Sequence, residues 1–383
     1  MNEYNFSIAL IVKDEEHNVQ RLAATVKDFI EDGGKVYFYD TGSTDNTVEV
    51  AKFLGFTQIT SEEDPYVSLS EVYHHAGTLQ PLLPDRNEKI FHFAKARNIL
   101  NRQIPTEWVM VVDADDMLEK FDFRTLQNFI VGNPNVDYIK YWYKYSDTFH
   151  FYRSHVFFKV QKFDWYGVCH EYIKPNVPES EINMINVSEQ VLSVMHLSGL
   201  KETRQKYTIQ LIYQYLQAPG VMRHIYYLGR ELYIRKHYHL ATLILAQYTD
   251  DESFPDEYAE AHWYAALAHE AISEPSHMRM AEDLLFSALR ATKTRRTFMM
   301  LAEFYHRNHC HQEAACFVAA ALEIKEMNGT LNDPRHHGDW PYEILYLSRY
   351  HSGNKEEGKP ALMQALFLNP TAEHHQNNTQ FFL

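Results

Sequence analysis

The sequence is poor in the features that mark secreted, disulfide-stapled or membrane-embedded proteins. Its 383 residues include only three cysteines, Cys169, Cys310 and Cys316, which contain no C-x-x-C pair and cannot form a disulfide framework. No apolar run approaches the roughly 18 residues that span a bilayer. The first residues also lack the basic stretch of a signal peptide. We therefore expect a protein with no membrane span, located in the reducing environment of the cytoplasm.

Basic residues are outnumbered by acidic ones. The chain has 36 lysines and arginines against 51 aspartates and glutamates, which gives a formal net charge of −15. Because phosphate backbones attract clustered positive charge, this balance argues against a general polyanion binder, although a local basic surface stays compatible with it. A hydrophobic share of 45% and a charged share of 23% indicate a globular chain, and its length predicts two or three domains.

The first part of the chain alternates apolar runs with polar turns. Strands are predicted at 6–12, 36–39, 108–112, 136–145 and 156–163, with helices at 15–31 and 47–54. Alternation of strands and helices is typical of a mostly parallel, Rossmann-like α/β sheet. The later, aromatic-rich strands indicate a mixed or antiparallel extension of that sheet.

From about residue 201 onward, helical spacing replaces strand alternation. Large and small apolar residues recur at matching offsets, as in Leu228, Gly229, Ala241 and Leu245, then Trp263, Ala281, Leu285 and Ala288, then Leu301, Ala302, Ala314 and Val318, then Leu345, Gly358, Leu362 and Ala365. This pattern resembles the tetratricopeptide repeat, with a generic helical bundle as the alternative. Either would offer a surface for a protein partner or for self-association. The predicted domains are 1–200, a helical junction at 201–222, and 223–383.

Acid-rich loops follow three of the predicted strands. They contain Asp14-Glu15-Glu16, Asp40-Thr-Gly-Ser-Thr-Asp45 and Asp113-Ala-Asp-Asp116. In open α/β sheets, ligands bind beyond the carboxyl ends of the strands. An Asp-x-Asp triplet directly after an apolar strand suits Mg²⁺ or Mn²⁺, which bind carboxylate oxygens together with substrate phosphates. The loops therefore predict a nucleotide and cation site, whereas the second loop alone also fits a capped turn without a ligand.

Four stretches together resemble glycosyltransferase family 2, which has the GT-A fold. They are 8–16, 40–47, 93–98 and 112–116, in the order and spacing of that family. Two later stretches, 166–171 and 195–199, are similar to motifs of a subgroup whose catalytic domain is followed by tetratricopeptide-like helices. The resemblance implies a GT-A domain that uses a nucleotide sugar, followed by a helical repeat domain.

The resemblance also implies roles for single residues. The nucleotide-sugar pocket would be formed by Val12, Asp14, Glu15, Asp40, Gly42, Ser43, Arg97, Asp113 and Ala114. Asp14 stands where the family often has asparagine, which leaves the role of its carboxylate open. Mn²⁺ or Mg²⁺ would be held by Asp115, His196 and Asp113, the last through the ribose or a metal-bound water. The donor implied is UDP-linked.

The expected reaction is transfer of a hexosyl or pentosyl group with inversion at the anomeric carbon. Glu171 is the candidate general base and Asp116 the alternative. The acceptor would be a glycan or peptide, contacted by Trp165, His170, Lys201, Arg204 and Arg230. Basic residues gather near the domain junction, so a hydroxylated base of DNA is an alternative acceptor. A non-catalytic nucleotide-binding scaffold with interaction repeats is the alternative from another class.

Several adjacent histidines invite a comparison with zinc sites. The pairs His74-His75, His309-Cys-His311 and His336-His337 lack a complete tetrahedral ligand set with zinc-site spacing. No structural zinc is therefore expected at these pairs.

Overall fold

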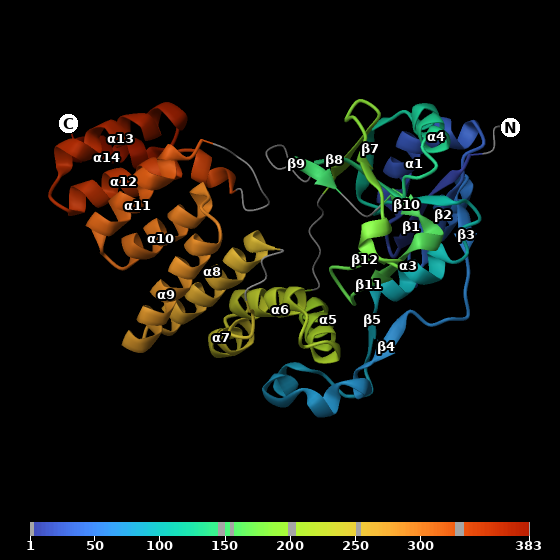
Figure 1. Cartoon of the computed structure of the whole chain (residues 1–383), viewed down its shortest axis with the longest axis horizontal. Helices are drawn as coiled ribbons and strands as arrows, with labels where there is room; N and C mark the ends of the chain where they lie inside the picture. Colours follow the sequence, from blue (N-terminus) through green and yellow to red (C-terminus); the bar gives the residue numbers. More distant parts are fainter. Residues whose placement is uncertain are drawn as a thin grey trace. The chain divides into compact units, whose positions relative to one another are not determined.

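The computed structural model describes residues 4–144, 150–153, 157–197, 204–249, 254–325 and 333–382. The chain divides into two compact units, Met1–Gln214 and Tyr215–Leu383, here called the N-terminal unit and the helical unit. Figure 1 shows strands with flanking helices in the N-terminal unit, and helices alone in the helical unit. The division falls inside helix α5 (Arg204–Gln217). The domain bounds expected from the sequence stay a prediction.

Ten strands in the described part of the N-terminal unit form one mixed sheet. They are β1 (Phe6–Val12), β2 (Val36–Asp40), β3 (Thr57–Ile59), β6 (Trp108–Val111), β7 (Asp116–Phe121), β8 (Tyr138–Lys144), β9 (His150–Arg153), β10 (Phe157–Lys159), β13 (Met184–Asn186) and β14 (Leu192–His196). The order is β3-β2-β1-β6-β10-β8-β14-β7, with β9 and β13 also paired to β8. Strands β3, β2, β1 and β6 are parallel, whereas β10 pairs antiparallel with β6 and β7 pairs antiparallel with β14. This topology confirms the predicted fold class.

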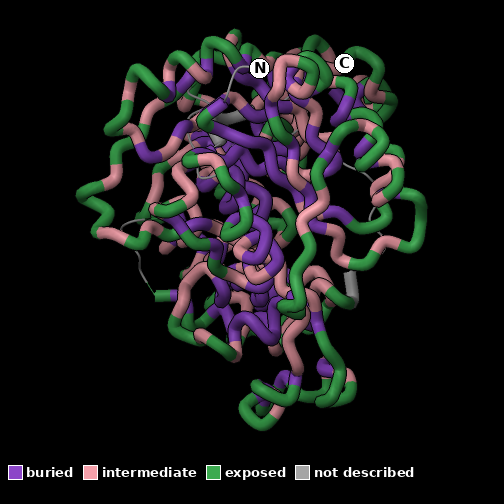
Figure 2. The backbone as a smooth tube through the Cα atoms, turned by 90° about the vertical axis from the view of Figure 1, so that its right-hand side faces the viewer, coloured by how far each residue is buried: buried purple, intermediate pink, exposed green. Residues whose placement is uncertain are grey.

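Helices cover both faces of the sheet. They are α1 (Glu16–Glu31), α2 (Thr47–Phe53), α3 (Phe93–Asn101) and α4 (Phe123–Gly132), and Figure 1 shows α1 and α4 on one side of the strands and α3 on the other. Phe29 of α1 stacks on Phe6 of β1 with 5.1 Å between ring centroids, and both are fully buried. A Cβ on Gly34 would lie 2.3 Å from the Phe29 ring, so the chain that leaves α1 needs glycine there. Figure 2 shows the buried core as purple segments inside the unit.

Two short hairpins lie outside the main sheet. One pairs β4 (Tyr66–Ser68) with β5 (Lys89–Phe91), and the other pairs β11 (Phe163–Tyr166) with β12 (Tyr172–Pro175). Three 3₁₀ turns, Leu69–Glu71, Tyr73–His75 and Gly77–Leu82, lie between β4 and β5. The turn of the second hairpin carries the 166–171 motif. Gln214 of α5 fixes this turn, because its Oε1 accepts the amides of Val168 at 2.6 Å and Cys169 at 3.1 Å.

Paired helices build the helical unit. They are α6 (Met222–Ile234), α7 (Tyr238–Leu245), α8 (Pro255–Ile272), α9 (Pro275–Ala291), α10 (Arg295–Arg307), α11 (His311–Glu323), α12 (Trp340–His351), α13 (Lys355–Leu368) and α14 (Glu373–Phe382). Each even-numbered helix from α6 to α12 contacts its successor, and small residues lie where they touch. This arrangement confirms the predicted tetratricopeptide-like fold.

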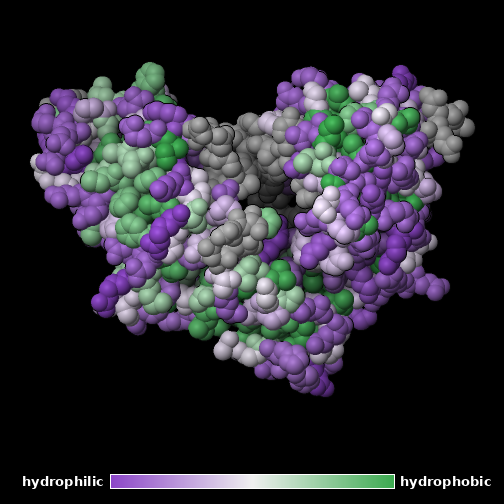
Figure 3. Space-filling view, viewed as in Figure 1, coloured by the Kyte–Doolittle hydropathy of each residue, from purple (hydrophilic) through white to green (hydrophobic). Residues whose placement is uncertain are grey.

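The face of each unit that Figure 3 shows is mainly hydrophilic, with hydrophobic patches between the hydrophilic residues. In the part of the chain that the structure describes, no helix combines the length and the apolar character that crossing a bilayer requires.

Candidate active site

Three parallel strands bring the predicted loops to one edge of the sheet. Val12 at the end of β1 lies in register with Asp40 at the end of β2. On the other side of β1, β6 runs parallel and the Val112 amide donates to the carbonyl of Ala9 at 3.0 Å. The chain then enters the Asp113 loop. Because parallel strands end at the same edge, the loops after β1, β2 and β6 are neighbours.

The first two loops are locked to each other by their carboxylates. Asp40 accepts the Ser43 hydroxyl at 2.6 Å and the Gly42 amide at 3.1 Å. Asp14 accepts the amide of Thr44 at 2.6 Å, and this bond is the main reason that the pKa of Asp14 lies below its ordinary value. Gly42 has a φ of 107°, which a residue without a Cβ adopts readily. Asp14 and Asp40 therefore hold a preformed turn.

Glu15 joins the same assembly through its backbone. Its amide donates to the Thr47 hydroxyl at 2.8 Å, at the first residue of α2. Its carboxylate accepts the side-chain amide of Asn18 in the first turn of α1. Val12 and Ala114, which the sequence also assigns to the pocket, are both buried. These two residues therefore contribute to the predicted pocket through their backbone and not through their side chains.

Arg97 of α3 is a buried cation between two carboxylates. Its Nη2 lies 2.8 Å from Asp113 Oδ1 and its Nε lies 2.7 Å from Glu171 Oε1. The guanidinium carbon lies 5.0 Å from the ring centroid of Trp165. Burial disfavours the charged form, but Glu171 and Asp113 outweigh it and keep the pKa of Arg97 above its ordinary value. The third nitrogen, Nη1, is buried with no hydrogen-bond partner among the described residues.

A second cluster joins Asp115, Asp116 and His196. Antiparallel pairing of β7 and β14 puts His196 opposite Asp116. His196 Nδ1 lies 3.2 Å from Asp116 Oδ1 and 3.8 Å from Asp115 Oδ1. One ligand atom from each residue lies within 4.8 Å of the others. The hydrogen bond with Asp116 is the main cause that raises the pKa of His196, against the opposing effect of burial. Two buried carboxylates and an imidazole can hold a divalent cation.

Both oxygens of Asp116 are used inside the protein. Oδ1 accepts the Tyr143 hydroxyl at 2.8 Å, and Oδ2 accepts the amide of Asp113 at 3.0 Å. Tyr143 was not predicted as a site residue. Its side chain lies on the buried face of β8, but no local pattern in the sequence pairs it with Asp116.

The residues predicted to contact the acceptor are spread more widely. Trp165 is buried under Arg97, and its backbone exchanges two hydrogen bonds of 2.9 Å with the side chain of Asn98. His170 has a φ of 51° and contacts the Tyr207 hydroxyl. Arg230 belongs to α6 of the helical unit. Lys201 and the side chain of Arg204 lie outside the described residues.

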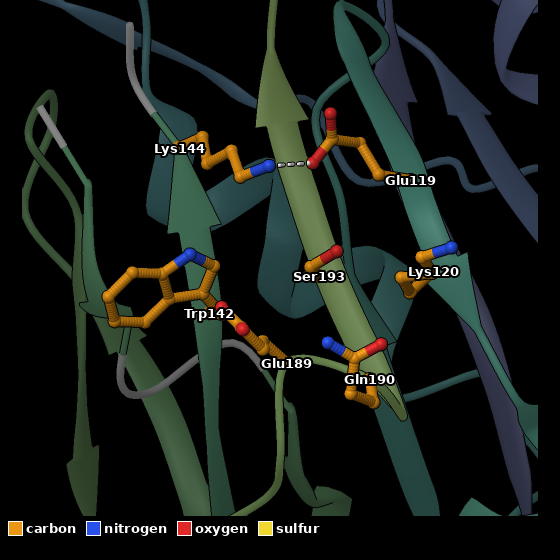
Figure 4. A pocket seen from close by; sticks show the side chains of 7 residues that line it. All are labelled: Glu119, Lys120, Trp142, Lys144, Glu189, Gln190 and Ser193. Carbon is orange, nitrogen blue, oxygen red and sulfur yellow. Dashed lines mark ion pairs between the residues drawn. The ribbon is translucent and has the colours of Figure 1, made fainter. Parts of the chain in front are cut away.

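A cavity of about 320 Å³ opens beside β7, β8 and β14. It is lined by Glu119, Lys120, Trp142, Lys144, Glu189, Gln190 and Ser193 (Figure 4). Lys144 is paired with Glu119 at 2.6 Å. Trp142 and Lys144 alternate along β8 with Tyr143, whose hydroxyl reaches Asp116. Because successive side chains of a strand point to opposite faces, this cavity lies on the other face of the sheet from the carboxylate cluster.

Comparisons with known proteins address the N-terminal unit most directly. A model of the family described as glycosyl transferase family 2 matches residues 7–183. No curated protein matches the chain. Residues 7–183 include all three strand-end loops, Arg97 and Glu171, but not His196 or the helical unit.

Several solved structures are distantly similar. PilF of Pseudomonas aeruginosa is 11% identical over 47% of this chain and 82% of its own, with a TM-score of 0.35. Glucosyl-3-phosphoglycerate synthase from Mycobacterium tuberculosis in complex with phosphoglyceric acid is 13% identical over 56% of this chain and 80% of its own, with a TM-score of 0.34. Its complex with Mn²⁺, UDP and phosphoglyceric acid is 16% identical over 37% of this chain and 43% of its own, with a TM-score of 0.24, so this match spans less than half of that chain.

These TM-scores are too low to carry an argument. The family model agrees with the geometry at the sheet edge, because the matched segment contains the loops that the fold brings together. Residues 7–183 therefore resemble glycosyl transferase family 2, and they are called the family 2 segment below.

Proposed function

We propose that the chain is a metal-dependent glycosyltransferase. It moves a hexosyl or pentosyl group from a nucleotide sugar, UDP-linked, to a glycan or peptide, with inversion at the anomeric carbon. The observation that supports this most is the buried Arg97 between Asp113 and Glu171, at the same sheet edge as Asp115 and His196. That arrangement combines a cation, a candidate base and a candidate metal site within the family 2 segment and the strand that follows it.

The residues present fit a divalent cation. Asp115 and His196 would hold Mn²⁺ or Mg²⁺, and Asp116 orients His196 through the 3.2 Å contact with Nδ1. An imidazole in the set favours Mn²⁺, because Mg²⁺ prefers a shell of oxygens alone. When bound, the cation would offset the negative charge that grows on the departing nucleoside diphosphate.

The nucleotide would bind across the two locked loops. Because Asp14 and Asp40 already hold the turn, nucleotide binding would lose little conformational entropy in ordering these loops. Arg97 Nη1 is a buried donor without a partner, which is costly unless a ligand accepts its hydrogen bond. An oxygen of the ribose or the diphosphate would satisfy it.

Glu171 is better suited than Asp116 to take the proton of the acceptor. Oε1 of Glu171 is bonded to Arg97, while Oε2 has no hydrogen-bond partner among the described residues. Asp116 has both oxygens engaged and is almost fully buried. We therefore assign proton abstraction to Glu171 Oε2 and a positioning role to Asp116.

The helical unit fits a glycan or peptide better than DNA. Two arginines of the basic group are already neutralised, because Arg223 pairs with Glu257 and Arg235 with Glu231, each at 3.1 Å. Arg230 lies over the rings of Tyr226 and Tyr227, at 5.5 and 5.0 Å from their centroids. Paired charges attract phosphates weakly, which argues against DNA as the acceptor.

A thermal-shift panel of nucleotide sugars with Mn²⁺ tests this proposal. Because a ligand that binds the native state stabilises it by mass action, UDP-sugars should raise the melting temperature and the true donor should raise it most. GDP-sugars and samples with EDTA serve as controls. An unchanged melting temperature with every nucleotide sugar would overturn the enzyme assignment. Product formation only with DNA that carries hydroxylated bases would replace the glycan or peptide acceptor by DNA.

A further inference from the structure

Two histidines and two carboxylates meet at one end of the helical unit, far along the chain from the family 2 segment. Asp339 precedes the first residue of α12, and Glu343 lies one helical turn further on. His374 and His375 are the second and third residues of α14. Residues four apart on a helix share a face, so α12 presents both carboxylates toward the start of α14. None of these residues belongs to the proposed catalytic site.

Two of the distances between these groups are close to those within a tetrahedral metal site. His375 Nε2 lies 2.9 Å from Asp339 Oδ2, and His374 Nε2 lies 3.3 Å from Glu343 Oε2. Ligand atoms of Asp339, His374 and His375 all lie within 4.8 Å of one another. Zinc bonds of about 2.0–2.1 Å at tetrahedral angles put neighbouring ligand atoms about 3.3 Å apart. Small side-chain shifts would therefore complete a shell of two nitrogens and two oxygens.

The surroundings hold the ligands in place. His375 is fully buried, and its Nδ1 lies 3.1 Å from the Tyr346 hydroxyl. The side-chain amides of Asn378 and Asn369 donate to the Tyr346 hydroxyl and to Asp339 Oδ2, each at 2.9 Å. In metal sites the second ring nitrogen of a histidine ligand usually has such a partner, which fixes the ring and the nitrogen that faces the metal. Half of the His374 side chain is exposed, which leaves a path for an ion.

We propose that Asp339, Glu343, His374 and His375 form a zinc site that fastens α14 to α12. Zn²⁺ is a first-row cation that accepts imidazole and carboxylate ligands in tetrahedral geometry. Spacing along the sequence does not reveal this site, because its carboxylates come from a different helix. The same four residues without metal would still form two hydrogen-bonded pairs, and that is the explanation that the experiment must separate from a zinc site.

A metal at this position would stabilise the end of the repeat stack. The helix α14 has ten residues, a length at which an isolated helix is marginal in water. Its far end is held by Phe382, which packs in a core cluster with Tyr346 of α12. The zinc site would hold the near end in the same way, so that both ends of α14 are anchored on α12.

Titration of the metal-stripped full chain with Co²⁺ and Zn²⁺ tests the proposal. Tetrahedral Co²⁺ has intense visible d–d absorption, which Zn²⁺ should abolish by displacement. The variant His374→Ala should lose one equivalent of this absorption and bind Zn²⁺ at this site at least about 100-fold more weakly. Tyr346→Phe, which removes the partner of His375 Nδ1, should weaken Zn²⁺ binding about tenfold.

Matched variants separate this site from other histidines. The double variant His74→Ala/His75→Ala removes an exposed adjacent pair in the N-terminal unit, and it should keep the full absorption. His196→Ala should keep the equivalent that His374→Ala loses. Without metal, His374→Ala should melt at the wild-type temperature, which excludes misfolding as the cause. Unchanged tetrahedral Co²⁺ absorption in His374→Ala, or no such absorption in the wild-type chain, would overturn the zinc site.

Discussion

In the proposed reaction Glu171 would take the proton of the acceptor, and its Oε1 accepts a hydrogen bond from Arg97 Nε at 2.7 Å. In Glu171→Gln the side-chain carbonyl can keep that bond, so the fold should persist while the base is lost. We expect kcat to fall about 10²–10⁴-fold, the usual share of a general base, with little change in UDP affinity. Steady-state UDP release and calorimetric UDP binding measure the two effects.

The control for this variant is Glu63→Gln, which alters an exposed carboxylate paired with Arg102. It should leave kcat within a factor of two or so, since exposed ion pairs contribute little. Near-normal turnover in Glu171→Gln would reassign the base to another residue.

Replacement of Arg97 should strongly lower the free energy of unfolding of the N-terminal unit. Replacement by methionine leaves Asp113 and Glu171 as facing carboxylates, and breaking a buried ion pair in this way costs about 3–5 kcal/mol. Urea unfolding monitored by circular dichroism should show that loss in the free energy of unfolding. The matched variant Arg102→Met, which breaks an exposed pair with Glu63, should cost under about 1 kcal/mol. Equal effects of the two variants would show that Arg97 is not buried between charges.

At the scale of elements, the contact between α6 and α7 depends on one small residue. A Cβ on Gly229 would lie 2.3 Å from Leu245 Cγ, so with alanine either the Leu245 side chain or the helix pair must shift. We expect Gly229→Ala to lower the free energy of unfolding by about 1–3 kcal/mol, although alanine favours helix more than glycine does. In Gly132→Ala, at the end of α4, the added Cβ meets nothing within 4 Å. That variant should be neutral or stabilising, and a neutral Gly229→Ala would contradict the tight helix pair.

The start of β8 is held by a buried carboxylate, and this predicts a pH dependence. Asp137 accepts the amide of Asn183 at 3.0 Å and lies 2.9 Å from Lys162 Nζ. Burial raises the pKa of Asp137, but these partners outweigh it and the pKa lies below its ordinary value. A carboxyl with a lowered folded-state pKa stabilises the fold above its unfolded value of about 3.9, and the effect is lost as pH falls through the folded value.

Asp137→Asn should therefore lower the free energy of unfolding by about 1–3 kcal/mol at pH 7, and by less at pH 3. Denaturant titrations at the two pH values measure this difference. Asp28→Asn, on the exposed side of α1, should show little change at either pH. A loss for Asp137→Asn that is the same at both pH values would contradict the ionised, paired carboxylate.

At the scale of the whole molecule, the apolar pattern predicted the fold because the central strands β1 and β6 are continuous buried runs, whereas helix α1 buries one face. The strands at 6–12 and 108–112 and the helix at 15–31 are found at nearly those bounds. Parallel topology then placed the Asp40 and Asp113 loops at one edge. Contacts between residues far apart in sequence could not be predicted, such as Tyr143 with Asp116 or Gln214 with the 168–169 turn. Neither leaves a local pattern.

In the proposed site, the sheet edge binds UDP through a divalent cation held by Asp115 and His196. Calorimetric titration of UDP into the full chain tests it most directly, with Mn²⁺ and with EDTA, for the wild-type protein and for Asp115→Asn. We predict one UDP per chain with Mn²⁺, and binding weakened at least about tenfold by EDTA and by Asp115→Asn alike. UDP binding of equal strength with EDTA, or no UDP binding by the wild-type chain with Mn²⁺, would rule out a UDP site that depends on this cation.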